Sequence, residues 1–231
     1  MKQNGILLNL TEKDFELIKE VGDEHVSTSL ETPLKKNAHD LSDHDKMDKI
    51  AGHFAEIMDT LGLDLSDDSL HGTPLRVAKM YVDVVFYGLN PKNKPEVKLF
   101  DNKYGYNEML VEKDIKVHSF CEHHFVPIIG KAHVAYINSG KVVGLSKLNR
   151  VVDYFARRPQ VQERLTVQIA NELKKALKTD DVAVIIDAKH MCVTMRGIED
   201  VESSTVTASY NGAFKDQKTK GEFLKYVYGD K

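Results

Sequence analysis

Apolar positions in the first third of the chain recur every three or four residues, which is the period of an amphipathic helix. The pattern predicts a helix that Ser42 or Asp43 caps and Gly62 ends, with an apolar face of Met47, Ile50, Phe54, Ile57, Met58 and Leu61. A second helix is predicted from Thr73-Pro74, with the hydroxyl as cap and proline at the first helical position, to Gly88. We expect these apolar residues to be core. Residues 1–41 predict only a weak helix and a linker.

Later in the chain the period changes to alternation, which is typical of strands with one buried face. Residues 112–120 predict a strand whose inner face continues to Cys121, and 132–137 predict the returning strand. Two helices are predicted next, the first capped by Ser146 and the second started by Pro159. Further strands are predicted over 182–187, 190–196 and 201–210, and a last helix over 216–228. The order of elements predicts an α+β fold.

The chain has 231 residues, which is enough for one large core or two small ones. A formal net charge of −3 argues against general binding to nucleic acid or to a membrane surface. No apolar run has the length of a membrane span, and the N-terminal run is too short for a signal peptide, so we expect a cytoplasmic protein. There the two cysteines are expected to be reduced, with a disulfide as the alternative.

Both cysteines have histidine neighbours, which favours a metal site. The candidate ligands of a Zn²⁺ ion are Cys121, His124 and Cys192, with His123 and His190 beside them. On an extended strand, residues two apart share a face about 6.6 Å apart, so His190 and Cys192 should address one site. His123 and His124 should point apart, which favours three ligands and an open catalytic position. A structural zinc with His123 or His190 as fourth ligand is the alternative.

Several polar residues suit a phosphorylated purine. Ser146, Lys147 and Arg150 place a hydroxyl and two cations at a predicted helix start, where backbone N–H groups bind phosphate. Arg196, on the predicted strand of Cys192, could add a cation to the same site, and Arg76 opposes the dipole of its helix as if it served an external anion. In Gln162-Glu163 the carboxylate can accept two N–H bonds from a guanine edge. Taken singly, the basic face, Arg76 and Glu163 are each better explained as solvated surface.

Together and in this order, the motifs resemble the GTP cyclohydrolase I family. The resemblance extends from about Asp40 to Lys225. It is carried by the blocks Asp67-Asp68-Ser69-Leu70, Thr73-Pro74-Leu75-Arg76, Cys121-Glu122-His123-His124-Phe125, Gly144-Leu145-Ser146-Lys147-Leu148-Asn149-Arg150, Arg157-Arg158-Pro159-Gln160-Val161-Gln162-Glu163-Arg164-Leu165 and His190-Met191-Cys192-Val193. Several such blocks in register make the resemblance specific.

The resemblance implies a tunnelling fold, which is an antiparallel β-sheet with paired helices on one face, preceded by an N-terminal helical region. It divides the chain into a variable segment over 1–41, a helical region over 42–108 and a catalytic domain over 109–231. It also implies a homodecamer of stacked rings with active sites between subunits. No nucleic-acid or membrane partner is expected.

The resemblance further implies the reaction and the role of each residue. Zinc-dependent hydrolysis would open the guanine imidazole ring of GTP at C8, release formate and give 7,8-dihydroneopterin triphosphate, the first step of tetrahydrofolate and pterin biosynthesis. Cys121, His124 and Cys192 would bind zinc, and His123 and His190 would transfer protons. Glu163 with Gln162 would anchor the guanine. The triphosphate would contact Ser146, Lys147, Arg150 and Arg196, with Arg76 supplied by a neighbouring subunit.

Three other functions compete with this hypothesis. A zinc nucleoside deaminase would need a Cys-x-x-Cys pair, which the chain lacks. Other tunnelling-fold enzymes differ in their metal chemistry: pyruvoyl-tetrahydropterin synthase uses a histidine-only zinc set, and preQ₀ nitrile reductase a nucleophilic cysteine without metal. A zinc-stabilised binding module would unfold when the metal is removed.

Overall fold

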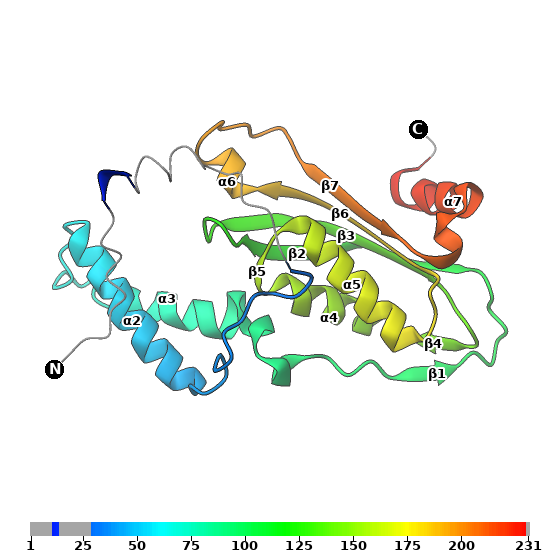
Figure 1. Ribbon diagram of the computed structural model, residues 1–231, viewed down its shortest axis with the longest axis horizontal. Helices are drawn as coiled ribbons and strands as arrows, with labels where there is room; N and C mark the ends of the chain where they lie inside the picture. Colours follow the sequence, from blue (N-terminus) through cyan, green and yellow to red (C-terminus); the bar gives the residue numbers. More distant parts are fainter. Residues whose placement is uncertain (1–10, 14–28, 230–231) are drawn as a thin grey trace.

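The computed structural model describes residues 11–13 and 29–229 (Figure 1). The weak helix and linker predicted for residues 1–41 therefore lie largely outside the described residues. The α-helices of residues 29–229 are α2 (Asp43–Thr60), α3 (Thr73–Lys79), α4 (Leu145–Ala156), α5 (Gln162–Leu177), α6 (Met191–Thr194) and α7 (Gln217–Tyr228). The π-helix η1 (Met80–Val85) directly follows α3. The strands are β1 (Leu99–Asp101), β2 (Met109–Cys121), β3 (Pro127–Ile137), β4 (Lys141–Val143), β5 (Pro159–Gln160), β6 (Val182–His190) and β7 (Thr205–Tyr210). Among the described residues, no helix is both long and apolar enough to cross a bilayer.

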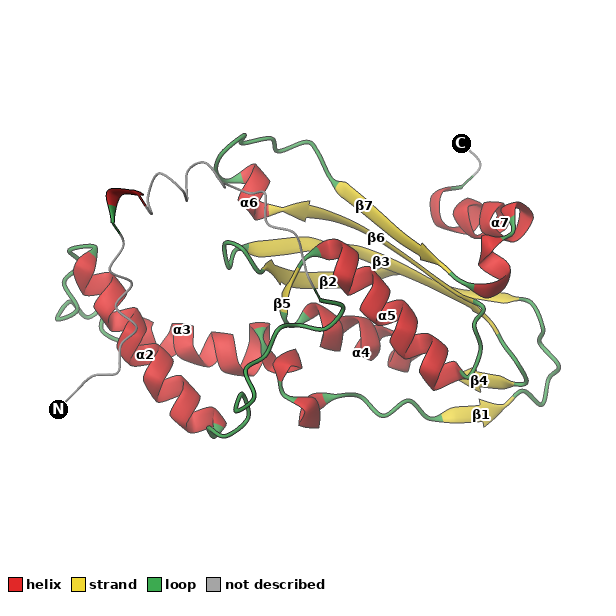
Figure 2. Ribbon diagram, viewed as in Figure 1, coloured by secondary structure: helices red, strands yellow, loops and turns green. Residues whose placement is uncertain are grey.

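Five strands form the main sheet in the order β5-β2-β3-β6-β7, and β1 pairs with β4 in a small separate sheet. The long strands β2, β3, β6 and β7 are antiparallel, whereas the short β5 runs parallel to β2. Helices α4 and α5 pack against each other and cover one face of the sheet (Figure 2). The predicted α+β fold, with an antiparallel sheet and paired helices on one face, is therefore confirmed.

Strand β6 contributes to two cores, which explains its nearly continuous apolar sequence. Val184 and Ile186 are buried beneath α4 and α5 in the larger core. Ile185 points to the opposite face, where it packs with Phe214 and Phe223. Burial of each such side chain stabilises the fold by about 1.5–3 kcal/mol. Because the cores lie along the sheet, they hold the strand ends from which the site residues emerge.

Helix α2 has the predicted bounds but not the predicted burial. Ser42 caps it: its hydroxyl accepts the Asp45 N–H at 3.1 Å, and its own N–H donates to the Asp45 carboxylate at 3.3 Å. The expectation that the apolar residues are core is wrong for most of them, since only Met58 is buried, whereas Ile57 is 52% and Leu61 72% exposed. The reason is that α2 packs on α3 and the turn that follows it, away from the sheet (Figure 1).

Two predicted helix caps are wrong. Helix α3 starts one residue earlier than predicted, because Gly72 is its N-cap and Thr73 its first residue. Helix α4 likewise begins at Leu145 after the N-cap Gly144, so Ser146 lies in the first turn and does not cap the helix. In both places a glycine precedes the helix, with an extended backbone at Gly144 and a φ of −88° and ψ of −1° at Gly72.

Two predictions on the strands near the site are also wrong. Pro159 does not start α5; with Gln160 it forms the edge strand β5, a position where the missing N–H of proline is tolerated. Of the strand predicted over 190–196, only His190 is in a strand, as the last residue of β6. The pairing of β6 with β3 ends at His190 opposite Ile128, and the preceding Pro127 has no N–H to donate. The chain therefore leaves the sheet after His190 and turns into α6.

Candidate active site

Cys121 ends β2, and the three residues after it form a tight turn. The turn is closed by hydrogen bonds from the Phe125 N–H to the Cys121 carbonyl at 2.9 Å and from the Cys121 N–H to the Val126 carbonyl at 2.8 Å. Phe125 has a positive φ of 53°, and its ring packs edge-on against Phe86 at 5.2 Å between ring centroids. We refer to residues 121–125 as the metal turn.

The metal turn changes the expected direction of two imidazoles. Nδ1 of His123 lies 3.8 Å and Nδ1 of His124 4.0 Å from the Cys121 sulfur. The expectation that neighbouring histidines point apart is wrong here, because it assumed an extended chain and the chain turns at this point. Both rings therefore face the thiol.

Three side chains form a cluster suited to a metal ion. The candidate ligand atoms of Cys121, His124 and Cys192 all lie within 4.8 Å of one another. Ligand bonds of about 2.0–2.3 Å place tetrahedral donors within about 4 Å of one another, so small side-chain movements would close the cluster on an ion. Two thiols and an imidazole are donors for a metal that prefers sulfur and nitrogen. Cys121 and Cys192 are not joined in a disulfide, so that alternative is not observed.

Cys192 and Arg196 reach the cluster from outside the sheet. Cys192 lies in the helical turn α6, so the strand geometry expected for His190 and Cys192 is wrong, although both residues are still found at this end of β6. Arg196 follows α6, and its guanidinium lies 2.7 Å from Nε2 of His124. A guanidinium has no acceptor, so Arg196 is the donor in this contact. The predicted cation therefore lies beside the metal cluster.

The amide of Gln162 fixes the state of the His190 ring. Gln162 is 1% exposed, and its NH₂ group donates to the carbonyls of Ile186 at 3.1 Å and Thr205 at 2.7 Å. Its carbonyl oxygen therefore faces Nε2 of His190 at 2.8 Å and can only accept. His190 must carry its proton on Nε2, which leaves Nδ1 as the nitrogen available for exchange. Gln162 thus contacts His190 and backbone carbonyls from a buried position.

Glu163, the next residue, is exposed in the first turn of α5. A carboxylate at this end of a helix is stabilised by the helix dipole. Burial lowers the pKa of His190 below its usual value, and the negative charge of Glu163 partly opposes that shift. A neutral imidazole and a solvent-facing carboxylate therefore lie close together beside the metal cluster.

Three predicted phosphate-binding residues lie at the other end of the sheet. Ser146, Lys147 and Arg150 are in the first turns of α4, where the neighbouring Asn149 donates to Glu112 at 3.1 Å. Glu112 precedes Cys121 by nine residues on β2, which corresponds to about 30 Å of strand. Within one chain, this group and the metal cluster are therefore far apart (Figure 2).

Arg76, the remaining predicted phosphate-binding residue, lies on α3 in the helical region. Its guanidinium turns back on its own segment and donates to the Ser69 carbonyl at 3.1 Å and the Thr73 hydroxyl at 3.0 Å. The side chain is exposed, so it is accessible to a ligand or to another chain.

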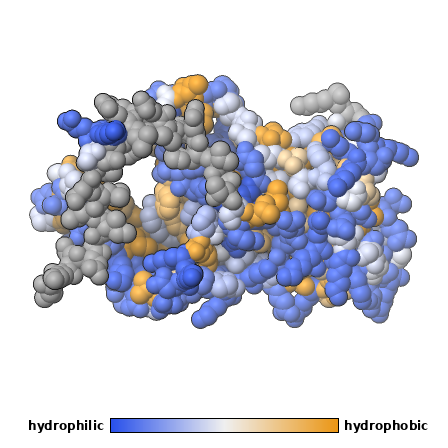
Figure 3. Space-filling view, viewed as in Figure 1, coloured by the Kyte–Doolittle hydropathy of each residue, from blue (hydrophilic) through white to orange (hydrophobic). Residues whose placement is uncertain are grey.

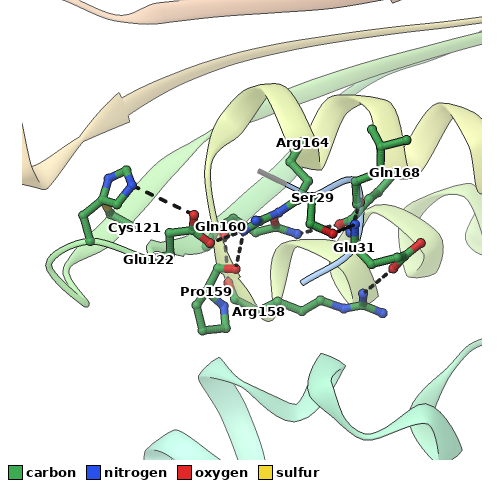
Figure 4. Close-up of polar contacts among 12 residues, drawn as sticks. Ser29, Glu31, Cys121, Glu122, Arg158, Pro159, Gln160, Arg164 and Gln168 are labelled. Carbon is green, nitrogen blue, oxygen red and sulfur yellow. Dashed lines mark hydrogen bonds and ion pairs between the residues drawn. The ribbon is translucent and has the colours of Figure 1, made fainter. Parts of the chain in front are cut away.

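Sequence reasoning missed a buried ion pair beside the metal turn. Arg164 on α5 contacts the carboxylate of Glu122, and Gln160 and Gln168 continue the polar contacts away from the site (Figure 4). All three α5-side residues are buried. Part of the signal was present, because Arg164 and Gln168 are polar residues four apart on the face of α5 that also carries the apolar Leu165 and Ile169.

Comparison with known proteins shows the family of the chain. A family model described as GTP cyclohydrolase I matches residues 50–228. A GTP cyclohydrolase 1 from Flavobacterium johnsoniae is 58% identical over 218 residues, 94% of this chain and 97% of the relative. One from Escherichia coli is 53% identical over 203 residues, 87% of this chain and 91% of the relative. Among solved structures, the apo archaeosine synthase QueF-Like matches with a TM-score of 0.38 and 18% identity, over 46% of this chain and 94% of that one. The chain belongs to the GTP cyclohydrolase I family.

Proposed function

We propose that the chain opens the imidazole ring of GTP at C8, releases formate and forms 7,8-dihydroneopterin triphosphate at the site around Cys121, His124 and Cys192. GTP cyclohydrolase I activity follows from the family. The observation that supports this location is the convergence of the three donors with His190 and Glu163, which come from three separate segments of the chain.

Zinc is the metal that best fits the donor set. Two thiolates and one imidazole are typical zinc ligands, and three protein ligands leave one coordination position open. When bound, zinc lowers the pKa of a water molecule toward about 7 and supplies a nucleophile at neutral pH. The two neighbouring histidines make a purely structural zinc site less consistent with the arrangement, because both are placed to transfer protons.

His190 is proposed to protonate N7 of the guanine, which makes C8 electrophilic. Gln162 holds the Nε2 proton, so Nδ1 would first take up a proton from solvent, which gives the imidazolium, and would then pass that proton to N7. His123 has its Nδ1 3.8 Å from the Cys121 sulfur and its Nε2 3.9 Å from the Glu122 carboxylate. We assign it to proton transfers in the later ribose rearrangement, for which an imidazole near neutral pH is suited.

The base and the phosphates are proposed to bind on two sides of this centre. Glu163 would accept N–H bonds from N1 and the exocyclic amine of guanine, while Arg196 beside His124 would contact the phosphates. Gln162 supports the site through its hydrogen bond to His190. Its amide is already bonded to His190 and to two backbone carbonyls, so we do not assign it a contact with the base.

A site between subunits accounts for the remaining cations. Ser146, Lys147 and Arg150 are about 30 Å from the metal cluster along the sheet, so in one site they would have to come from a neighbouring chain. The exposed apolar face of α2 also suits burial against another subunit. We therefore propose a homodecamer in which a neighbouring subunit completes the triphosphate site, with Arg76 contributed in the same way.

Glu163→Gln should weaken recognition of the base. The substitution removes the charge that accepts the two guanine N–H groups, and each charge-assisted hydrogen bond is worth about 1.5–3 kcal/mol. We expect kcat/KM for GTP to fall at least about 10-fold, mainly through KM, in steady-state assays of formate release. Glu222→Gln on α7, an exposed carboxylate on the other face of the sheet, should leave kcat/KM unchanged. An unchanged KM in Glu163→Gln would place the guanine elsewhere.

Incubation of the purified protein with GTP, with and without a chelator, tests the function. Formate and the fluorescence of oxidised neopterin should appear together and should both be lost on chelation, while circular dichroism shows the fold retained. A chelator that unfolds the chain would instead favour a zinc-stabilised binding module. Formation of another product, or metal-independent turnover, would favour a different tunnelling-fold enzyme.

A further inference from the structure

Glu122, inside the metal turn, is held through both its backbone and its side chain. Its N–H donates to the Gln160 carbonyl at 3.0 Å, and its carboxylate forms an ion pair with Arg164 of α5 (Figure 4). The side chain of Arg164 is 3% and that of Glu122 20% exposed. The pair therefore joins the turn that carries two proposed metal ligands to the helix beneath it.

Arg164 is itself fixed by buried partners. Its Nε donates to Oε1 of Gln160 at 3.0 Å, and its Nη2 also reaches the Pro159 carbonyl at 3.2 Å. The amide of Gln160 can take only this orientation, because its Nε2 donates to the Phe155 carbonyl at 2.9 Å and to Gln168 at 2.8 Å. Rotation of Arg164 away from Glu122 would leave buried polar atoms without partners, which is costly.

The metal turn needs such support. Phe125 has a left-handed backbone conformation, which L-residues adopt only where the surrounding structure imposes it. On one side the Phe125 ring packs against Phe86, and on the other Glu122 is bound to Arg164. The direction of Cys121 and His124 toward Cys192 depends on this turn.

We propose that Glu122 and Arg164 are positioning residues for the metal centre, acting by fixing the turn so that Cys121 and His124 face Cys192. The inference rests on the proposed metal site. Neither residue belongs to the ligand set, and the pair acts on the metal through the backbone of the turn. Residues that orient metal ligands commonly change metal affinity about 10–100-fold when they are replaced.

Zinc affinity of the metal-free protein, measured by competition with a chelator, tests the proposal. Glu122→Gln keeps the shape of the side chain and removes its charge, and we expect zinc binding to weaken about 10–100-fold. The matched control is Glu172→Gln, which breaks the ion pair between Glu172 and Lys94. Glu172 lies on α5, as Arg164 does, and its side chain is 16% exposed. This variant should bind zinc as the wild type does.

Two further measurements separate positioning from a general loss of stability. The absorption spectrum of the Co²⁺-substituted protein reports ligand geometry, and it should change in Glu122→Gln but not in Glu172→Gln. Arg164→Gln should weaken zinc binding to a similar extent, and the double variant should be no weaker than the weaker single variant, because both remove the same contact. If Arg164→Gln does not fold, the zinc affinity of Glu122→Gln compared with that of Glu172→Gln tests the proposal on its own.

The outcomes distinguish this inference from the proposed function. If wild-type protein binds zinc and Glu122→Gln binds it equally well with an unchanged cobalt spectrum, the positioning role is rejected and the metal site stands. If the wild-type protein binds no zinc, the metal site and the inference are both rejected.

Discussion

Replacement of Cys192 by serine is expected to remove the bound zinc and to abolish formation of formate from GTP. Cys192 is one of three proposed ligands, and a serine hydroxyl is a poor substitute for a thiolate on zinc. The loss of activity should exceed the roughly 100-fold change that accompanies loss of a residue merely orienting a ligand. Metal analysis of the purified variant and an assay of formate release measure the two effects.

The position of Cys192 makes this a clean test of the metal. The residue lies in the short turn α6 at the end of β6, and its side chain only borders the main core, so serine should leave the fold intact by circular dichroism. The control is Met195→Ala, three residues later in the chain. Met195 is 63% exposed, and this variant should keep both zinc and activity. A Cys192→Ser protein that retained full activity would mean that the reaction does not depend on this cluster.

The proposed metal ligands were accessible to sequence reasoning because their chemistry is rare in this chain. There are only two cysteines, and each has one histidine within two residues. Their number and neighbours suggested one site without any knowledge of the fold. The structure supplies the geometry that the pattern lacked, since the cluster forms from a tight turn after β2 and a helical turn after β6.

The local conformations could not be predicted because they depend on contacts between distant segments. The end of β6 is set by its partner strand, which begins at Pro127, more than fifty residues earlier in the chain. Likewise, Gln162 and Arg164 were visible as polar residues near a helix start, but their burial depends on strands β6 and β7 and on the metal turn. Hydrophobic periodicity predicts the helices and strands, whereas the contacts of Gln162 and Arg164 depend on how distant segments pack together.

Burial was mispredicted for α2, which packs away from the sheet (Figure 1). The apolar period of α2 correctly predicted the helix, yet Ile57 and Leu61 are exposed. If a neighbouring subunit covers α2, as proposed above, the same assembly would bring Lys147 and Arg150 of one chain to the metal cluster of another. A single sequence does not distinguish an apolar face that packs within the chain from one that packs between chains.

His190→Ala should lower kcat by about 10²–10⁴-fold, the usual contribution of a positioned general acid, while zinc content is retained because His190 is not one of the proposed ligands. Since the proton on Nε2 is held by Gln162, alanine removes the only nitrogen of this ring that could deliver a proton to N7. Single-turnover formate release measures the step directly. His118→Ala, an exposed histidine on β2, is the control and should react at the wild-type rate. Wild-type formate release by His190→Ala would assign the first proton transfer to another group, of which His123, beside the Cys121 sulfur, is the nearest candidate.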